Sequence, residues 1–94
     1  MAAATKASRL QLSESYERAY RKLKGALPRK LLNKAAKLFI ANRWATSLKF
    51  QEVAGQQGLF KYRINLRWHV VLVRKEDAGG VYYVAVDIQH HDDY

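Results

Sequence analysis

The sequence predicts an α+β domain, in which a pair of helices packs on one face of a four-stranded antiparallel sheet. Two observations support this fold class. Apolar residues recur at three- and four-residue spacing in the first half of the chain and at two-residue spacing in the second half. In addition, 94 residues are enough for one hydrophobic core and too few for two. We therefore expect residues 1–7 to form a flexible end and residues 8–94 to form a single domain.

The expected element order is β-α-α-β-β-β, and its first half is a strand followed by two helices. A short strand at residues 9–12 alternates polar and apolar side chains, and Ser13 follows as a candidate N-cap of the first helix. Gly25 and Pro28 end that helix. Pro28 also suits the first turn of a second helix, which we expect to run to about Arg43. The short link between the two helices predicts an antiparallel helical hairpin.

The second half of the chain predicts three strands joined by tight turns. Alternation in residues 59–65 indicates one strand, and the β-branched run in residues 70–73 indicates the next. A turn at residues 76–80, which contains two glycines, leads into a strand at residues 81–87. These strands complete a sheet with one face left free for function. Residues 45–58 contain no element that the pattern predicts.

The chain is strongly basic, with a formal net charge of +9, and residues 18–51 hold ten lysines and arginines but no acidic residue. Surface helices usually balance their lysines with glutamates, so nucleic acid is the leading partner class. We expect a set of cations to follow its phosphates: Arg21, Lys22, Lys24, Arg29, Lys30, Lys34, Lys37, Lys49 and Arg67. The alternative is that these side chains only solvate exposed faces.

Several classes of protein are excluded by what the sequence lacks. It has no cysteine, which rules out disulfides, thiolate nucleophiles and the usual structural zinc sites. It has no apolar stretch of signal-peptide or membrane-spanning length, so we expect a cytoplasmic protein without membrane contact. The histidines and aspartates of residues 87–93 lack a spacing that would fix three metal ligands on one face. We therefore expect neither a metal nor another cofactor.

Three segments carry a family resemblance. Leu59-Phe-Lys-Tyr-Arg-Ile-Asn65 resembles a Gly-x-Tyr-Arg-x-Arg strand, Trp68-His-Val-Val-Leu resembles Tyr-Arg-Val-x-Tyr, and Ile88-Gln-His-His-Asp-Asp-Tyr94 resembles Val-Gly-His-Arg-Asp-x-x-Tyr. Together with the element order, these motifs resemble the RelE/ParE superfamily of toxins from toxin–antitoxin pairs, over roughly residues 10–94. Its RelE and HigB branches are ribosome-dependent endoribonucleases that cut messenger RNA, whereas its ParE branch poisons DNA gyrase. The resemblance implies one of these activities and a cognate antitoxin as partner.

The resemblance also implies a candidate catalytic site of five residues. Lys61 and Arg63 fall on the basic strand that faces the scissile phosphate in the family. His69 and His91 stand where the family has arginines, and Tyr94 lies near its C-terminal tyrosine. Alternate residues of a strand share a face, and a hairpin would bring Lys61 and Arg63 beside His69.

Histidines at these positions suit the cleavage of RNA without a metal. That reaction needs a base for the ribose 2′-hydroxyl, positive charge near the phosphate oxygens and an acid for the leaving 5′-oxygen. An imidazole, with a reference pKa of ~6.5, can serve as base or acid, whereas an arginine stays charged. We assign proton transfer first to His91, with His69 as its complement and the two basic side chains as a phosphate clamp.

Other interpretations remain open for these residues. His69 could equally be a half-buried structural residue, and the whole chain could be a basic binding module with inert histidines. Neighbouring residues on a strand point to opposite faces, so at most one of His90 and His91 can enter a pocket. For the same reason Tyr82 and Tyr83 cannot both pack inward unless a bulge intervenes.

Overall fold

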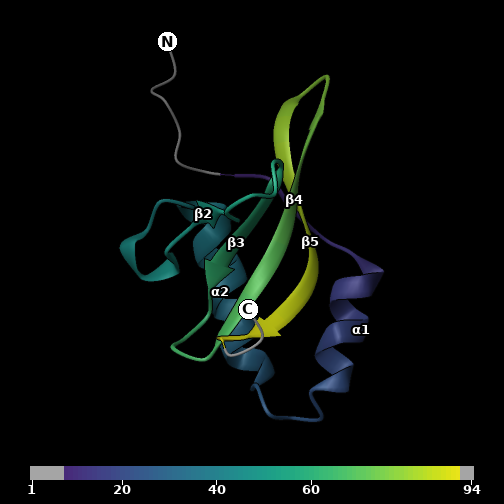
Figure 1. Ribbon diagram of the computed structural model, residues 1–94, viewed down its shortest axis with the longest axis vertical. Helices are drawn as coiled ribbons and strands as arrows, with labels where there is room; N and C mark the ends of the chain where they lie inside the picture. The colour runs from purple at the N-terminus through teal and green to yellow at the C-terminus, as the bar shows by residue number, and fades with distance from the viewer. Residues whose placement is uncertain (1–7, 92–94) are drawn as a thin grey trace.

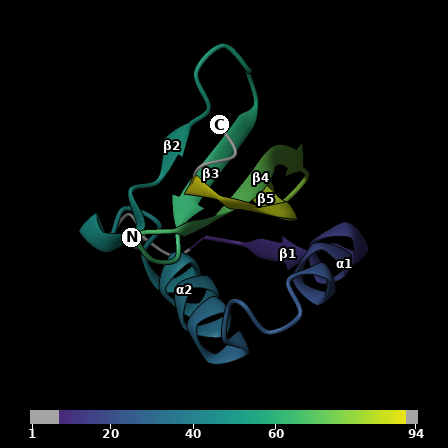
Figure 2. The same ribbon diagram turned by 60° about the horizontal axis from the view of Figure 1, so that its bottom comes forward.

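The computed structural model describes residues 8–91, and its α+β architecture confirms the predicted fold class. In chain order the elements are β1 (Leu10–Leu12), α1 (Glu14–Lys22), α2 (Arg29–Ala41), a 3-10 turn η1 (Thr46–Leu48), β2 (Gln51–Glu52), β3 (Leu59–Arg63), β4 (Trp68–Asp77) and β5 (Gly80–His90). Both helices lie on the same side of the sheet (Figure 1, Figure 2). We call the opposite side the open face. Neither of these helices is long and apolar enough to span a membrane.

The sheet differs from the prediction in two respects, because it has five strands and is mixed. Its order is β1-β5-β4-β3-β2, and β1 runs parallel to β5, with Leu10 opposite Tyr83. The other pairs are antiparallel. Apolar alternation carries no information on strand direction, which explains why the parallel pairing of β1 with β5 was not predicted. The fifth strand, β2, was not predicted because its two residues are too few to show a period. In the structure β2 pairs with β3, and Gln51 lies opposite Lys61.

The termini of the helices follow local chemistry that the sequence shows. The Ser13 hydroxyl accepts a hydrogen bond from the Tyr16 N–H at 3.2 Å and donates to the Ala85 carbonyl at 2.7 Å, so the N-cap also ties α1 to β5. The helix ends at Lys22, and Gly25 then adopts a φ of 87° that favours glycine. Pro28 stands just before α2 rather than within its first turn, and α2 ends at Ala41, two residues before the predicted end.

The core lies between the helices and the sheet. Phe39 of α2 occupies its centre, stacked on Tyr62 at 5.0 Å between ring centroids and edge-on to Tyr83 at 5.5 Å. Tyr16 of α1 is also fully buried, and burial raises the pKa of its phenol and that of Tyr62 well above the ordinary value. The apolar residues of α2 that face this core are Leu32, Ala35, Ala36 and Phe39, whereas Leu31 and Ile40 remain exposed.

A β-bulge in β5 decides which residues reach the open face. Val71 lies opposite Asp87, but Leu72 lies opposite Ala85, so Val86 is an extra residue on β5. Without it, Ala85 and Asp87 would point to the same side of the sheet. The bulge keeps Ala85 in the core and turns Asp87 toward the open face.

Candidate active site

The open face gathers the basic residues of β3 and a histidine of β4. In the β3–β4 ladder Arg63 lies opposite His69, and Lys61 lies opposite Val71. Tyr62, which alternates with the two basic residues, points into the core. Because alternate residues of a strand share a face, Lys61, Arg63 and His69 lie on the same side of the sheet, as the sequence predicted.

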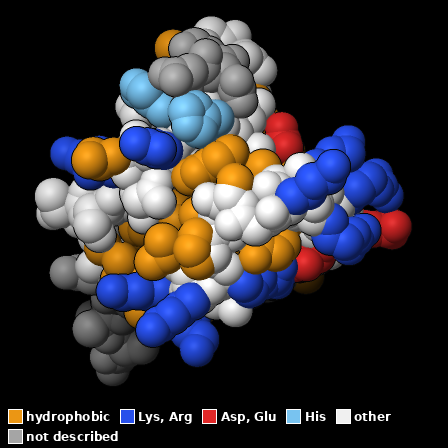
Figure 3. All heavy atoms as spheres, turned by 90° about the horizontal axis from the view of Figure 1, so that it is seen from below, with side chains coloured by type: hydrophobic (Ala, Val, Ile, Leu, Met, Phe, Trp, Pro, Cys, Tyr) orange, Lys and Arg blue, Asp and Glu red, His pale blue; other side chains and the backbone are white. Residues whose placement is uncertain are grey.

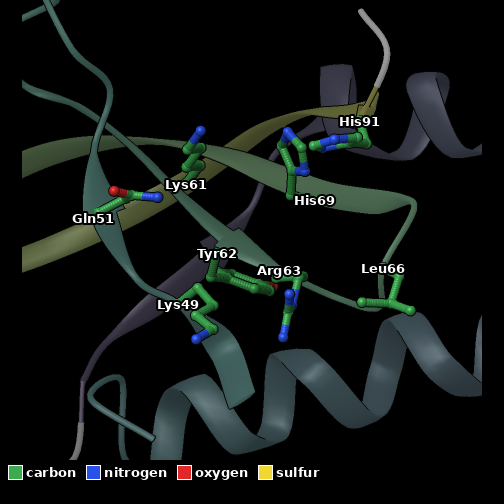
Figure 4. A pocket seen from close by; sticks show the side chains of 8 residues that line it. All are labelled: Lys49, Gln51, Lys61, Tyr62, Arg63, Leu66, His69 and His91. Atoms are coloured by element: carbon green, nitrogen blue, oxygen red, sulfur yellow. The ribbon is translucent and has the colours of Figure 1, made fainter. Parts of the chain in front are cut away.

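These residues border a pocket of about 340 Å³, which we call the histidine pocket. Its lining is Lys49, Gln51, Lys61, Tyr62, Arg63, Leu66, His69 and His91. The ring of His91 points toward that of His69, and Lys61 stands beside His69 along the sheet (Figure 4). His69 is buried, with 5% of its surface exposed, whereas His91 is exposed. None of these lining residues is acidic, so the pocket is electrostatically suited to an anion.

Backbone contacts hold His91 at the mouth of this pocket. Its N–H donates to the carbonyl of Arg67 at 2.6 Å, which ties the end of β5 to the β3–β4 turn. That turn is itself fixed, because the Asn65 side-chain carbonyl accepts from the N–H groups of Arg67 and Trp68. The His90 ring packs edge-on against Trp68 at 4.8 Å. His90 and His91 therefore diverge, and His91 alone of the two lines the histidine pocket.

Besides Tyr62, which lies mainly in the core, three lining residues were not predicted as part of this pocket. Lys49, expected among the cations that contact nucleic acid, enters it from the end of η1, where its φ of 50° is a left-handed conformation uncommon for a side-chain-bearing residue. Gln51 comes from β2 and Leu66, 79% exposed, from the β3–β4 turn. Lys49 and Gln51 lie in the segment without a predicted element, and no periodicity in the sequence marked them.

The other cations predicted to contact nucleic acid are spread over the helical side and the turns. Most of them are exposed: Arg21, Lys22, Lys24, Lys30, Lys34, Lys37 and Arg67. Arg29 differs, because both of its terminal nitrogens donate to the Glu17 carboxylate at 2.8 and 2.9 Å. This hydrogen-bonded pair lowers the pKa of Glu17, and Arg29 also lies 4.9 Å from the centre of the Tyr20 ring. Its charge is therefore already matched within the protein.

Lysines and arginines flank a hydrophobic region at the lower end of the molecule, next to exposed histidine surface (Figure 3). The helical side also has a groove between α2 and β3, which is lined by Leu31, Lys34, Ala35, Leu38, Ser47, Leu48, Arg63 and Ile64. Arg63 thus borders both this groove and the histidine pocket. Tyr94, the fifth candidate catalytic residue, lies outside the described residues. Within residues 8–91, no three histidine or acidic side chains are grouped closely enough to hold a metal ion.

Solved structures of bacterial toxins share this fold. A chain of the E. coli DinJ–YafQ toxin–antitoxin complex is 13% identical, with 90% of this chain and 93% of that chain covered and a TM-score of 0.68. A copper-bound mutant toxin from Helicobacter pylori is 15% identical, with coverages of 92% and 97% and a TM-score of 0.69. A YoeB/ParE toxin from Agrobacterium tumefaciens is also 15% identical, with coverages of 88% and 98% and a TM-score of 0.64.

These likenesses confirm that the chain has the fold of RelE/ParE-type toxins, as its motifs predicted. No family model matches the sequence, and no curated protein matches it either. At identities of 13–15% these neighbours share the fold alone, so the function has to be inferred from the residues of the open face.

Proposed function

We propose that this protein is a toxin of a toxin–antitoxin pair, which inhibits translation by cutting messenger RNA on the ribosome. The observation that carries the proposal is the histidine pocket, where His69 and His91 face each other beside Lys61 on the side of the sheet away from the helices. Two imidazoles can supply a base and an acid together, which is what phosphodiester cleavage by a 2′-hydroxyl requires.

The histidines and the cationic side chains of the histidine pocket each have a role in this reaction. His91 takes the proton of the ribose 2′-hydroxyl, and the 2′-oxygen attacks the adjacent phosphorus. The bond to the 5′-oxygen breaks, and His69 donates a proton to that leaving oxygen. The products are a 2′,3′-cyclic phosphate and a 5′-hydroxyl. Lys61 and Arg63 stabilise the charge that grows on the nonbridging oxygens, and Lys49 adds to the field that attracts the phosphate.

The exposed cations of α1, α2 and the turns fit a binding role toward ribosomal and messenger RNA. Their side chains contact phosphates without reading sequence, so they position the protein and leave cleavage to the histidine pocket. Arg29 contributes less to this surface, because Glu17 already matches its charge.

The proposed antitoxin is an acidic protein whose amphipathic segment binds the groove between α2 and β3. Leu31 and Leu38 contribute apolar lining to this groove, Lys34 and Arg63 contribute positive charge, and no carboxylate is among the lining residues. An acidic segment bound there would pair with Arg63 and so compete with RNA for the histidine pocket. The DinJ–YafQ neighbour is a toxin–antitoxin complex, which supports a partner of this kind.

Mapping RNA ends on translating ribosomes tests the enzymatic proposal. We expect the wild-type protein to cut messages and His91→Ala to lose that activity. His90→Gln is the matched control, since His90 is the adjacent histidine and lies against Trp68 instead of lining the pocket. Intact messages with the wild-type protein, together with loss of DNA supercoiling in a gyrase assay, would favour a ParE-like inhibitor and reject the nuclease.

A further inference from the structure

A second pocket adjoins the first on the open face. It has a volume of about 290 Å³ and is lined by Val53, Gln56, Leu59, Lys61, His69, Val71 and Gln89. We call it the amide pocket. Lys61 and His69 line both pockets, so the two meet at these side chains. A ligand bound at the histidines can therefore extend directly into the amide pocket.

The two pockets differ in their chemistry. Beyond the shared Lys61 and His69, the amide pocket has only uncharged lining: three aliphatic side chains and the carboxamides of Gln56 and Gln89. A phosphate prefers the cationic end of such a groove. A flat, neutral group with hydrogen-bonding edges suits the other end, where aliphatic side chains contact its faces and amides meet its polar atoms.

The position of Gln89 is set by two features of β5. The bulge at Val86 turns Gln89 toward the open face, where it lies opposite His69 in the β4–β5 ladder. Its side-chain nitrogen donates to the Asp87 carboxylate at 3.3 Å. This contact orients the carboxamide and leaves its oxygen and second N–H to pair with a ligand. The charge of Asp87 also disfavours a phosphate at this end.

Gln56 reaches the amide pocket from the loop between β2 and β3. Its N–H donates to the Val53 carbonyl, and its own carbonyl accepts from the Leu59 N–H, so a backbone turn holds it there. Gln57, the next residue, does not line the pocket. Carboxamides on two different elements can thus approach one ligand from two sides.

We propose that the amide pocket binds the base of a nucleotide next to the scissile phosphate, and that Gln89 and Gln56 give the enzyme a base preference. This inference rests on the proposed function, because it places the phosphate in the histidine pocket. A carboxamide pairs in a bidentate manner with the N6 and N7 atoms of adenine, so adenine is the expected base.

Cleavage on ribosomes gives the first test. Messages that differ by one base on either side of the cut are compared for the wild-type protein and Gln89→Leu. We expect the preference for adenine at one position to fall about tenfold in the variant, since a bidentate contact discriminates by roughly this factor or more. Gln56→Leu should lower it less, and Gln57→Leu is the matched control that should not change it. A base preference that is equal in all four proteins would overturn the proposal.

Binding gives a second test that does not depend on cleavage. Adenosine 5′-monophosphate and ribose 5-phosphate are titrated into the isotope-labelled, full-length chain, and side-chain amide signals are followed by NMR. We expect the nucleotide, but not the sugar phosphate, to shift the signals of Gln89 and Gln56. Equal shifts with both ligands, or shifts confined to the histidine pocket, would reject the base site. If the amide signals respond while ribosomal messages stay intact, the base site stands and the proposed nuclease fails.

Discussion

The two faces of the sheet are built from the same strands but follow different rules. On the helix side, Tyr62, Leu72 and Tyr83 are buried in one core cluster with Phe39, so shape and apolar contact decide which residues fit. On the open face, Lys61, Arg63 and His69 alternate with these core residues and line pockets. Substitutions on the first face should therefore change stability, and those on the second should change activity.

The core should show the largest effect on stability. Phe39→Ala removes the ring that contacts Tyr62, Tyr83 and Phe50, and it leaves a cavity in the centre of the domain. We expect a loss of about 3–5 kcal/mol in the free energy of unfolding. Urea denaturation followed by circular dichroism measures it. A loss below about 1 kcal/mol would show that the aromatic cluster does not hold the two layers together.

The open face should show the reverse behaviour. Lys61→Met should lower the rate of RNA cleavage about 10²–10³-fold, because a positioned positive charge at the phosphate is lost, while the melting temperature stays almost unchanged. Lys75→Met is the control, since Lys75 is an exposed lysine on β4 that lies outside both pockets. Equal rates for the two variants would remove Lys61 from the mechanism.

A smaller effect is expected on the helical cations. Lys34→Ala and Lys37→Ala should each weaken ribosome binding modestly, and each should reduce the slope of log affinity against log salt by about one. Filter binding at several salt concentrations measures the slope. Because these lysines lie on α2, away from the histidine pocket, the pattern of RNA ends should not change. An unaltered slope would show that α2 does not face RNA.

The smallest effect concerns pH and the link between the helices. Pairing with Arg29 lowers the pKa of Glu17, so the pair stabilises the fold above the unfolded pKa of ~4.3 and loses its contribution as pH falls through the lower folded value. Glu17→Gln should therefore cost about 0.5 kcal/mol near neutral pH and nothing at pH 2, since both side chains are about one-third exposed. Thermal melting across this range measures it. If the stability difference between the wild-type protein and Glu17→Gln were the same at neutral pH and at pH 2, the ion pair with Arg29 would not be its cause.

Patterns with a local cause were predictable from the sequence. Alternation put Lys61 and Arg63 on one face, the opposite orientation of neighbouring residues separated Tyr82 from Tyr83, and Ser13 was recognised as an N-cap. The structure places Tyr83 in the core and Tyr82 against Arg9. The same principle anticipated that His90 and His91 would diverge.

Features that depend on distant parts of the chain were not predictable. The parallel direction of β1 is set by its pairing with β5, where Leu10 lies opposite Tyr83, and the two residues of β2 are recognised as a strand by their pairing with β3. The bulge at Val86 has no signature in composition, yet it decides that Gln89 faces the open side. Lys49 enters the histidine pocket through a left-handed backbone conformation that periodicity does not reveal.

The chemical identity of the RNA ends is the sharpest test of cleavage by His69 and His91. Messages cut on ribosomes by the wild-type protein are analysed by mass spectrometry, alongside messages with a 2′-deoxy sugar at the cut site. The mechanism at His69 and His91 predicts 2′,3′-cyclic phosphate and 5′-hydroxyl ends, and no cleavage at the deoxy position. Ends with a 5′-phosphate, or cleavage that persists without the 2′-hydroxyl, would contradict it.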